Sequence, residues 1–247
     1  MIKLRFTYLS VALLLTAVAF ASPVPAPRIV EAATCDTSGS NYFDGVEHTS
    51  FTNIGAMAYI SNQDAKLCGA AWSDSSAWAM TTNISQGVYL QAGIGKSATD
   101  TMMLIFSEWK PRGGTAHRVT SYHPLGSAWY KAGLDTTSSK WYLAWSGDGT
   151  TWNNLDIVAD SSLNWFSFGD RPNQTQYEAE VHDSHDAVFG SSVSKGTWSS
   201  MQYKSSTTST WTSEYGITAT GPDSAIAGHA QFNFISNTNF QVWDTQN

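Results

Sequence analysis

Residues 86–114 read QGVYLQAGIGKSATDTMMLIFSEWKPRGG and contain two strand-like runs joined by a polar turn. In the first run, apolar side chains alternate with others in the period of two that is typical of a β-strand. Residues 96–100 supply the turn, and residues 102–109 form a second run rich in large apolar side chains. The stretch therefore predicts a β-hairpin with a polar Gln91 on its first strand and Glu108 on its second. Polar groups in apolar strands are costly to bury unless they form hydrogen bonds or take part in binding or catalysis. This hairpin is therefore the first candidate for a functional site.

Short alternating segments of the same kind recur along the rest of the chain, and none of them keeps a helical period. Clusters of Gly, Asn, Asp and Ser separate them, as in an all-β chain. Strands are predicted at residues 55–61, 77–82, 88–93, 102–109, 117–122, 128–134, 141–146, 151–158, 164–168, 177–182, 196–203, 210–217, 230–235 and 240–243. The pattern predicts an all-β fold, a β-sandwich or jelly roll of two curved antiparallel sheets of the concanavalin-like type.

The chain begins with a pattern typical of a secretory signal peptide, which we place at residues 1–21. Two basic residues, Lys3 and Arg5, precede a short apolar run, and Ala19-Phe-Ala21 offers a small-residue cleavage site. A cut near residue 33 is the alternative. The apolar run is shorter than the ~20 residues that a membrane-spanning helix needs. We therefore expect a secreted protein that does not bind a membrane.

Residues 22–34 are rich in proline, and we expect an N-terminal segment or short propeptide there, followed by a single β-sandwich domain over residues 35–247. The formal net charge of −7 and the absence of a basic run exclude a typical nucleic-acid binder. Cys35 and Cys68 are the two cysteines, and an oxidising compartment predicts that they form a disulfide. We expect a monomer.

A second stretch, residues 177–182, reads YEAEVH and places Glu178, Glu180 and His182 on one face of a strand. Such a face can be the solvated side of a sandwich. The alternative is a concave face on which a glutamate in partly apolar surroundings exchanges protons with a water. Residues 182–186, HDSHD, could contribute zinc ligands, but a zinc site needs three or four converging ligands and no third is evident. We therefore expect no metal.

Two of these stretches together resemble the glutamic peptidases known as eqolisins. Leu90-Gln-Ala-Gly93, a polar turn and Phe106-Ser-Glu-Trp-Lys-Pro111 are similar to the hairpin of that family, at a similar spacing. Ala179-Glu180 stands where the family has an Ala-Glu strand with its catalytic glutamate. The next residues, Val181-His182, depart from the aromatic and apolar residues of the family. The hairpin also has a more distant likeness to the neprosin family, which uses two glutamates, but Gln91 favours the eqolisins.

The resemblance implies an endopeptidase that takes a polypeptide substrate at acidic pH and needs no metal or cofactor. Glu180, or alternatively Glu178, would act as the general base toward a water. Gln91 would donate its amide N–H to the developing oxyanion. Glu108 and Trp109 would shape the substrate cleft.

Aromatic residues offer further candidate contacts, because eleven tryptophans are spread over the chain. Most of them suit a β-sheet core. Trp109 and Trp141 neighbour polar strand positions, and we add them and Tyr89 to the candidate substrate-binding residues. The same aromatics fit a non-catalytic, lectin-like sandwich that binds a polysaccharide, which is the alternative function. A glycoside hydrolase that pairs Glu108 with Glu178 or Glu180 is a third reading.

Overall fold

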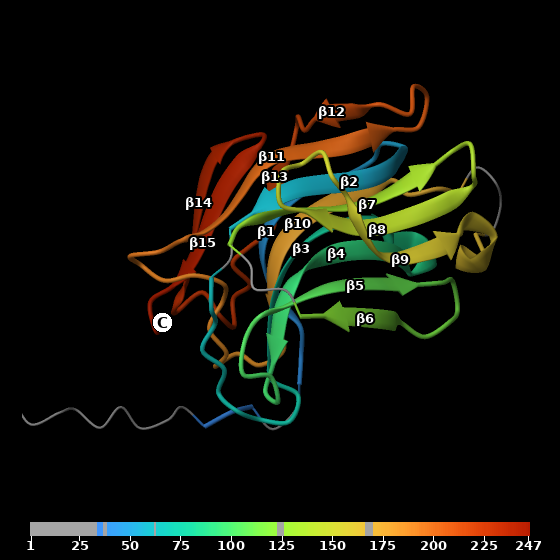
Figure 1. Cartoon of the computed structure of the whole chain (residues 1–247). Coiled ribbons are helices and arrows are strands. Elements are labelled where there is room, and N and C mark those ends of the chain that lie inside the picture. Colours follow the sequence, from blue (N-terminus) through green and yellow to red (C-terminus); the bar gives the residue numbers. More distant parts are fainter. Residues whose placement is uncertain (1–33, 37–38, 62, 123–125, 166–169) are drawn as a thin grey trace, which may run out of the picture. The chain divides into compact units, whose positions relative to one another are not determined.

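The computed structural model describes residues 34–36, 39–61, 63–122, 126–165 and 170–247, and its strands form two antiparallel sheets (Figure 1). Sheet A has seven strands in the order β13 (Thr218–Ala219), β1 (Tyr42–His48), β10 (Gln174–Val181), β3 (Asp74–Asn83), β4 (Val88–Ser97), β5 (Leu104–Lys110) and β6 (His117–Ser121). Sheet B has the order β14 (Ala230–Ser236), β15 (Asn239–Asp244), β11 (Gly196–Ser205), β2 (Asn53–Ile60), β7 (Ala128–Asp135), β8 (Lys140–Ser146) and β9 (Asn153–Ala159), with β12 (Trp211–Ser213) beside β11. The other regular elements of the described residues are two 3-10 turns, η1 (Ile84–Gln86) and η2 (Asp160–Leu163). The predicted all-β class is confirmed.

The core lies between the sheets and is built from alternate residues of each strand. On sheet A, the inward positions of β3 and β10 include Ala77, Ala79 and Ala179. These small side chains leave room for large ones from sheet B, among them the fully buried Trp198. The indole N–H of Trp198 donates to the backbone carbonyl of Trp78 over 3.1 Å, so the polar atom of that ring is satisfied. The remaining positions of β3 and β10 then point away from sheet B.

The hairpin predicted within residues 86–114 is confirmed as β4 and β5, which pair with Gln91 opposite Glu108. Strands β1 and β13 were not predicted from the sequence. The segment of β1, YFDGVEH, carries Asp, Gly and Glu, which weaken the pattern of a strand. The segment predicted at residues 210–217 is a strand only at Trp211–Ser213, and the one predicted at residues 164–168 lies mostly outside the described residues.

Cys35 and Cys68 form the predicted disulfide, which ties the N-terminal segment to the loop that follows β2. The signal peptide predicted at residues 1–21 and most of the Pro-rich segment lie outside the described residues. The residues that are described belong to one unit, Ala33–Asn247. None of their helices is long and apolar enough to span a membrane.

Candidate active site

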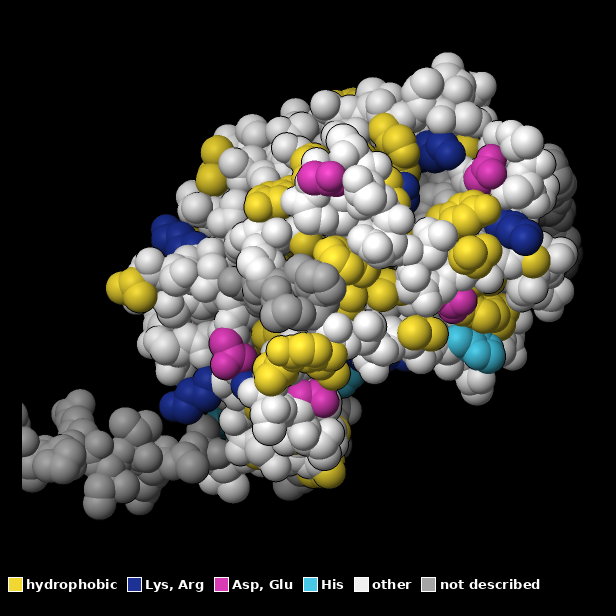
Figure 2. All heavy atoms as spheres, viewed as in Figure 1, with side chains coloured by type: hydrophobic (Ala, Val, Ile, Leu, Met, Phe, Trp, Pro, Cys, Tyr) yellow, Lys and Arg dark blue, Asp and Glu magenta, His cyan; other side chains and the backbone are white. Residues whose placement is uncertain are grey.

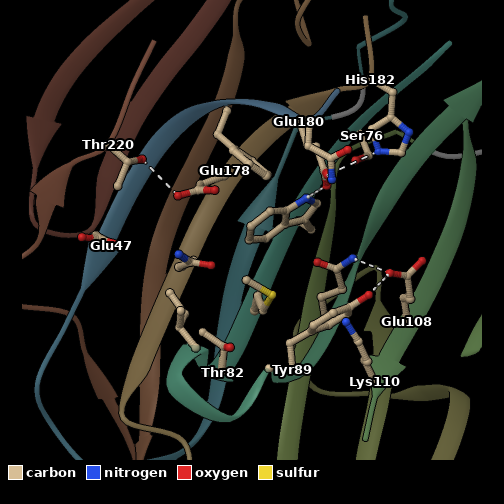
Figure 3. A pocket seen from close by; sticks show the side chains of 18 of the residues that line it. Glu47, Ser76, Thr82, Tyr89, Glu108, Lys110, Glu178, Glu180, His182 and Thr220 are labelled. Atoms are coloured by element: carbon tan, nitrogen blue, oxygen red, sulfur yellow. Dashed lines mark hydrogen bonds and ion pairs between the residues drawn. The ribbon is translucent and has the colours of Figure 1, made fainter. Parts of the chain in front are cut away.

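A groove of about 560 Å³ lies on the face of sheet A that points away from sheet B. Its walls and floor are outward side chains from neighbouring strands of that sheet (Figure 3). The predicted site residues Tyr89, Gln91, Glu108, Glu178 and Glu180 all line it. The structure thus brings together, on one face, residues that lie far apart in the sequence.

Two glycines allow bulky groove residues to lie close to the next strand. Gly93 on β4 pairs with Trp78 on β3, and a Cβ atom on Gly93 would lie 2.8 Å from the Cβ of Trp78. Gly45 on β1 pairs with Glu178 on β10, and a Cβ atom there would lie 2.8 Å from the Cγ of Glu178. Both distances are shorter than a real Cβ contact allows. The glycine of the Leu-Gln-Ala-Gly pattern therefore makes room for Trp78.

The carboxylate of Glu180 is held by three neighbours. Asn41 Nδ2 donates to Oε1 over 2.7 Å, and Trp78 Nε1 donates to Oε2 over 3.1 Å. His182 Nε2 lies 3.3 Å from Oε1, and this hydrogen bond raises the pKa of His182 above its ordinary value. These contacts fix the orientation of a carboxylate that lies in the groove and is 9% exposed.

Glu178 lies two residues before Glu180 on the same face of β10, but its surroundings differ. It is 3% exposed, and Thr220 Oγ1 donates to its Oε1 over 3.0 Å (Figure 3). Burial raises the pKa of Glu178 to about 8. The Glu178 carboxyl group is therefore protonated at acidic and neutral pH.

Gln91 lies on β4 and shares Glu108 with two other residues. Gln91 Nε2 donates to Glu108 Oε1 over 3.4 Å, and the hydroxyl of Tyr89 donates to the same oxygen over 2.6 Å. Arg118 Nη1 lies 3.8 Å from Oε2 of Glu108. Burial and the hydrogen bond to Glu108 raise the pKa of Tyr89, so the Tyr89 hydroxyl stays protonated and remains a donor. Glu108 thereby accepts one N–H of the Gln91 amide. The NH2 group of a primary amide has two N–H donors, so the second one remains available for another acceptor.

One strand separates the amide of Gln91 from the carboxylate of Glu180. On β3, Met80 pairs with Gln91 and Ser76 pairs with Glu180. Trp78 occupies the outward position between those two β3 residues and also lines the groove. The Trp78 side chain, which is almost fully buried, therefore lies between the amide and the carboxylate and is itself hydrogen-bonded to the carboxylate.

Two candidate substrate contacts lie elsewhere. Trp141 is 0% exposed, belongs to the core between the sheets, and donates its indole N–H to Asp160 over 2.7 Å. Trp109 follows Glu108 on β5 and so points to the other face, where it packs against the same core cluster. Its N–H donates to Asp156 over 2.9 Å. Neither tryptophan lines the groove, because the alternation of a strand turns both toward the core.

The His and Asp residues of segment 182–186, which were considered as possible zinc ligands, gain a third neighbour from the N-terminal segment. Asp36, Asp183 and His185 have ligand-capable atoms within 4.8 Å of one another. Their carboxylates already accept hydrogen bonds: Asp183 accepts from the backbone N–H of Asp36 over 2.8 Å and from Trp72 over 3.1 Å, and Asp36 accepts from the N–H of Ser184 over 2.9 Å. The cluster anchors the N-terminal segment next to the disulfide.

Several groove residues were not predicted from the sequence. Asn41 immediately precedes the unpredicted strand β1, and Thr220 follows the two-residue strand β13. Trp78 lies in a predicted strand but has the side chain of a core residue. The signal that could have found it is Gly93, since a glycine within a strand often marks the close approach of a neighbouring group.

The fold is similar to that of solved glutamic peptidases. The structure is similar to Scytalido-glutamic peptidase solved with a peptide-based transition-state analogue, with a TM-score of 0.59, 12% identity, and coverage of 84% of this chain and 100% of that chain. It is also similar to SCP-B, a member of the eqolisin family solved with the tripeptide Ala-Ile-His, with a TM-score of 0.57, 11% identity and the same coverage. At these identities the likeness is one of fold, and it confirms the β-sandwich that the sequence resemblance implied.

No protein-family model matches the sequence, and a search of curated proteins finds no relative.

Proposed function

We propose that this protein is a secreted glutamic-type endopeptidase that hydrolyses peptide bonds with Gln91, Glu180 and an activated water at acidic pH. The observation that carries the proposal is that Gln91 and Glu180 line one groove, with the Glu180 carboxylate held by Trp78 and Asn41. The fold is that of peptidases solved with peptide ligands, which supports a polypeptide substrate.

Glu180 suits the role of general base better than Glu178 does. A general base has to be ionised before it can accept a proton from water. Burial raises the pKa of Glu178 to about 8, so this group is a neutral acid wherever the enzyme works below neutrality. Glu180 instead faces the N–H groups of Asn41 and Trp78, which are donors that match a carboxylate. Glu178 adjoins the site without adding a second negative charge.

The reaction follows from these positions. Glu180 accepts a proton from a water, and the water oxygen attacks the scissile carbonyl carbon. The negative charge that develops on the carbonyl oxygen is stabilised by an N–H of Gln91, which does not ionise at any working pH. Collapse of the tetrahedral intermediate breaks the C–N bond, and Glu180 returns the proton to the leaving amine. The groove residues alone supply each proton transfer in this scheme.

Glu108 and Tyr89 support Gln91 in this scheme. Glu108 accepts one N–H of the amide and so orients the amide group, while the Tyr89 hydroxyl and Arg118 hold Glu108 itself. An amide orientated in advance loses less entropy when the substrate binds. Secretion is supported by the disulfide between Cys35 and Cys68, because such bonds persist in oxidising compartments.

The direct test is cleavage of a denatured protein by the purified protein from about pH 2 to pH 7, a range that spans carboxylate titration. We expect cleavage on the acidic side of neutrality. Glu180→Gln and Gln91→Ala are expected to lower kcat by about a hundredfold or more. Glu178→Gln is the matched control and should keep most of the activity, because the protonated acid and the amide carry the same charge.

Lack of cleavage by the wild type at every pH would remove the proposal. Loss of activity in Glu178→Gln with retention in Glu180→Gln would transfer the base to Glu178. Circular dichroism of each variant shows whether a loss of activity reflects chemistry or misfolding.

A further inference from the structure

A second hollow, of about 310 Å³, lies on the face of sheet B that points away from sheet A. Its lining includes the aromatic residues Tyr142, Trp152 and Trp211 and the lysines Lys131 and Lys204. Figure 2 shows dark-blue side chains among yellow ones at the upper right, where Figure 1 shows the ends of β7, β11 and β12. This site is separate from the groove, which lies on the outer face of the other sheet.

Trp211 is held against the backbone of two strands by a pair of glycines. Gly55 on β2 and Gly133 on β7 are register partners. A Cβ atom on Gly133 would lie 2.9 Å from the Trp211 ring, and one on Gly55 would lie 3.1 Å from it. The glycines therefore create the room in which the indole lies on the sheet. An indole fixed in this way is a rigid surface that loses little entropy when a ligand stacks on it.

Both lysine ammonium groups are directed into the same small region. Lys131 Nζ lies 3.6 Å from the centroid of the Trp152 ring, and Lys204 Nζ donates to the carbonyl of Leu134. Among the described residues, no carboxylate forms an ion pair with either nitrogen. Burial and the repulsion of Lys204 lower the pKa of Lys131 to about 8, and burial also lowers that of Lys204. A bound anion would offset this repulsion.

Asp135 is the acidic residue of the lining. Its negative charge attracts Lys204, and its oxygens accept hydrogen bonds within its own turn. The backbone N–H of Thr137 donates to Oδ1 over 2.9 Å, and Ser138 Oγ donates to Oδ2 over 2.8 Å. The ammonium groups of Lys131 and Lys204 therefore keep donors available for another acceptor, since each ammonium has three.

We propose that this hollow binds an acidic sugar unit, a uronate residue of a polysaccharide. The apolar C–H face of the sugar ring would stack on Trp211 or Trp152, and its carboxylate would accept charge-assisted hydrogen bonds from Lys131 and Lys204. A sugar acid presents an apolar face and an anion within one compact unit, which matches aromatic rings beside an ammonium pair.

The site would hold the protein on an acidic polysaccharide while the groove of sheet A stays open to a polypeptide. It does not depend on the proposed peptidase activity, because it uses different residues on a different sheet. Trp109 and Trp141, the tryptophans that the sequence suggested for ligand contact, belong to the core side, whereas Trp152 and Trp211 supply the outward aromatic surface.

The test is calorimetric titration of the full protein with a short oligogalacturonate at low ionic strength and pH 6. A neutral gluco-oligosaccharide, a sulfated one and a poly-glutamate peptide of matched length are the comparison ligands. We expect saturable binding of the uronate and none of the neutral sugar. Trp211→Ala and Lys131→Met should each raise the Kd for the uronate by about tenfold, the effect expected for the loss of one charged hydrogen bond or one stacking contact.

Lys195→Met is the matched control, because Lys195 Nζ also lies over a tryptophan, 3.9 Å from the Trp243 ring centroid, but outside the hollow. It should bind like the wild type. Lys131→Met keeps most of the lysine stem, so it decides the outcome if Trp211→Ala fails to fold. Equal binding of poly-glutamate, tighter binding of the sulfated sugar, or an unchanged Kd in Lys131→Met would each overturn the uronate site.

The pH dependence supplies an independent reading of the same site. The titratable groups facing Lys131 are Lys204, Asp135 and Tyr142. Of these, the lysine pair changes charge as the pH rises above neutrality. Uronate binding should therefore weaken progressively above about pH 8, and binding that stays constant up to pH 10 would argue against a lysine-bound carboxylate.

Discussion

The indole N–H of Trp78 donates to the carboxylate of Glu180 over 3.1 Å, from β3 to the neighbouring strand β10. In the register of these strands, Trp78 pairs with Glu178 and not with Glu180. The indole therefore reaches diagonally along the sheet, and Gly93 on its other side gives it the room to do so. A residue that looks like a core tryptophan in the sequence thus positions the candidate general base.

The change Trp78→Phe removes this hydrogen bond and keeps an aromatic ring. We expect kcat for peptide hydrolysis to fall by about tenfold or more with a smaller change in KM, because the Glu180 carboxylate loses a donor that orients it. The free energy of unfolding should fall by about 1–3 kcal/mol, the usual effect of removing a hydrogen bond to a charged group. Steady-state kinetics and urea unfolding measure the two effects.

The matched control is Trp198→Phe. That change also removes a buried indole N–H, the one that donates to the backbone carbonyl of Trp78. Its effect should appear in stability and leave kcat nearly unchanged. If both variants lose the same fraction of kcat, Trp78 acts through the fold alone and does not position Glu180.

Gly93→Ala tests the close approach of β4 to Trp78. The added methyl group would lie 2.8 Å from the Cβ of Trp78 and closer still to the carbonyl of Ala77, so the strands have to separate. We expect a loss of roughly 1–3 kcal/mol of stability, the range for overpacking, together with lower activity. Gly147→Ala is the control, because a Cβ atom there meets no atom within 4 Å. Equal urea midpoints for the two variants would refute the steric explanation.

The sequence could predict the features that depend on local pattern. The hairpin of β4 and β5, the shared face of Glu178 and Glu180, and the disulfide of Cys35 and Cys68 follow from alternation, turn residues and compartment chemistry. These predictions succeed because side chains two apart on a strand always share a face.

The features that the sequence could not predict depend on contacts between distant segments. Asn41 donates to Glu180 across 139 positions of sequence, and no local pattern reports such a partner. Trp141 has polar neighbours in the sequence, as an aromatic residue on the outer face of a sheet would, yet its side chain points into the core. Glu178 and Glu180 differ because Gly45 and Thr220 enclose only the first of them.

Four buried carboxyl groups, Asp44, Asp74, Glu178 and Asp186, bind their protons more tightly in the folded protein than in the unfolded chain. Burial raises the pKa of Asp44 to about 7, of Glu178 to about 8 and of Asp186 to about 6. In the unfolded chain the same groups titrate near pH 4. Their contribution to stability is therefore complete below about pH 4 and is lost as the pH rises toward 8. We expect the free energy of unfolding, measured in urea, to fall by several kcal/mol over that range.

The change Asp44→Asn isolates the contribution of the Asp44 carboxyl group to the pH dependence of stability. Both carboxyl oxygens of Asp44 are buried and have no hydrogen-bond partner among the described residues. The variant should match the wild type near pH 4 and exceed its stability by a few kcal/mol at pH 8, where the wild type buries a charge. Asp64→Asn, at a side chain that is 70% exposed, is the control and should follow the wild type. A wild type that is equally stable at pH 4 and pH 8 would contradict the prediction.

Removal of the disulfide should loosen the N-terminal segment and spare the groove. The bond joins two cysteines that are 33 positions apart in the sequence, Cys35 and Cys68, and for a loop of this length chain entropy predicts a stabilisation of about 4 kcal/mol. The double change Cys35→Ser and Cys68→Ser should lower Tm accordingly, while activity below the new Tm stays near that of the wild type, because neither cysteine lines the groove. The rate of amide hydrogen exchange in the double variant should increase most, relative to the wild type, in the loop that follows β2 and around Asp183, where the N-terminal segment is anchored. Greater exchange in β3 and β10 instead would mean that the disulfide also supports the site.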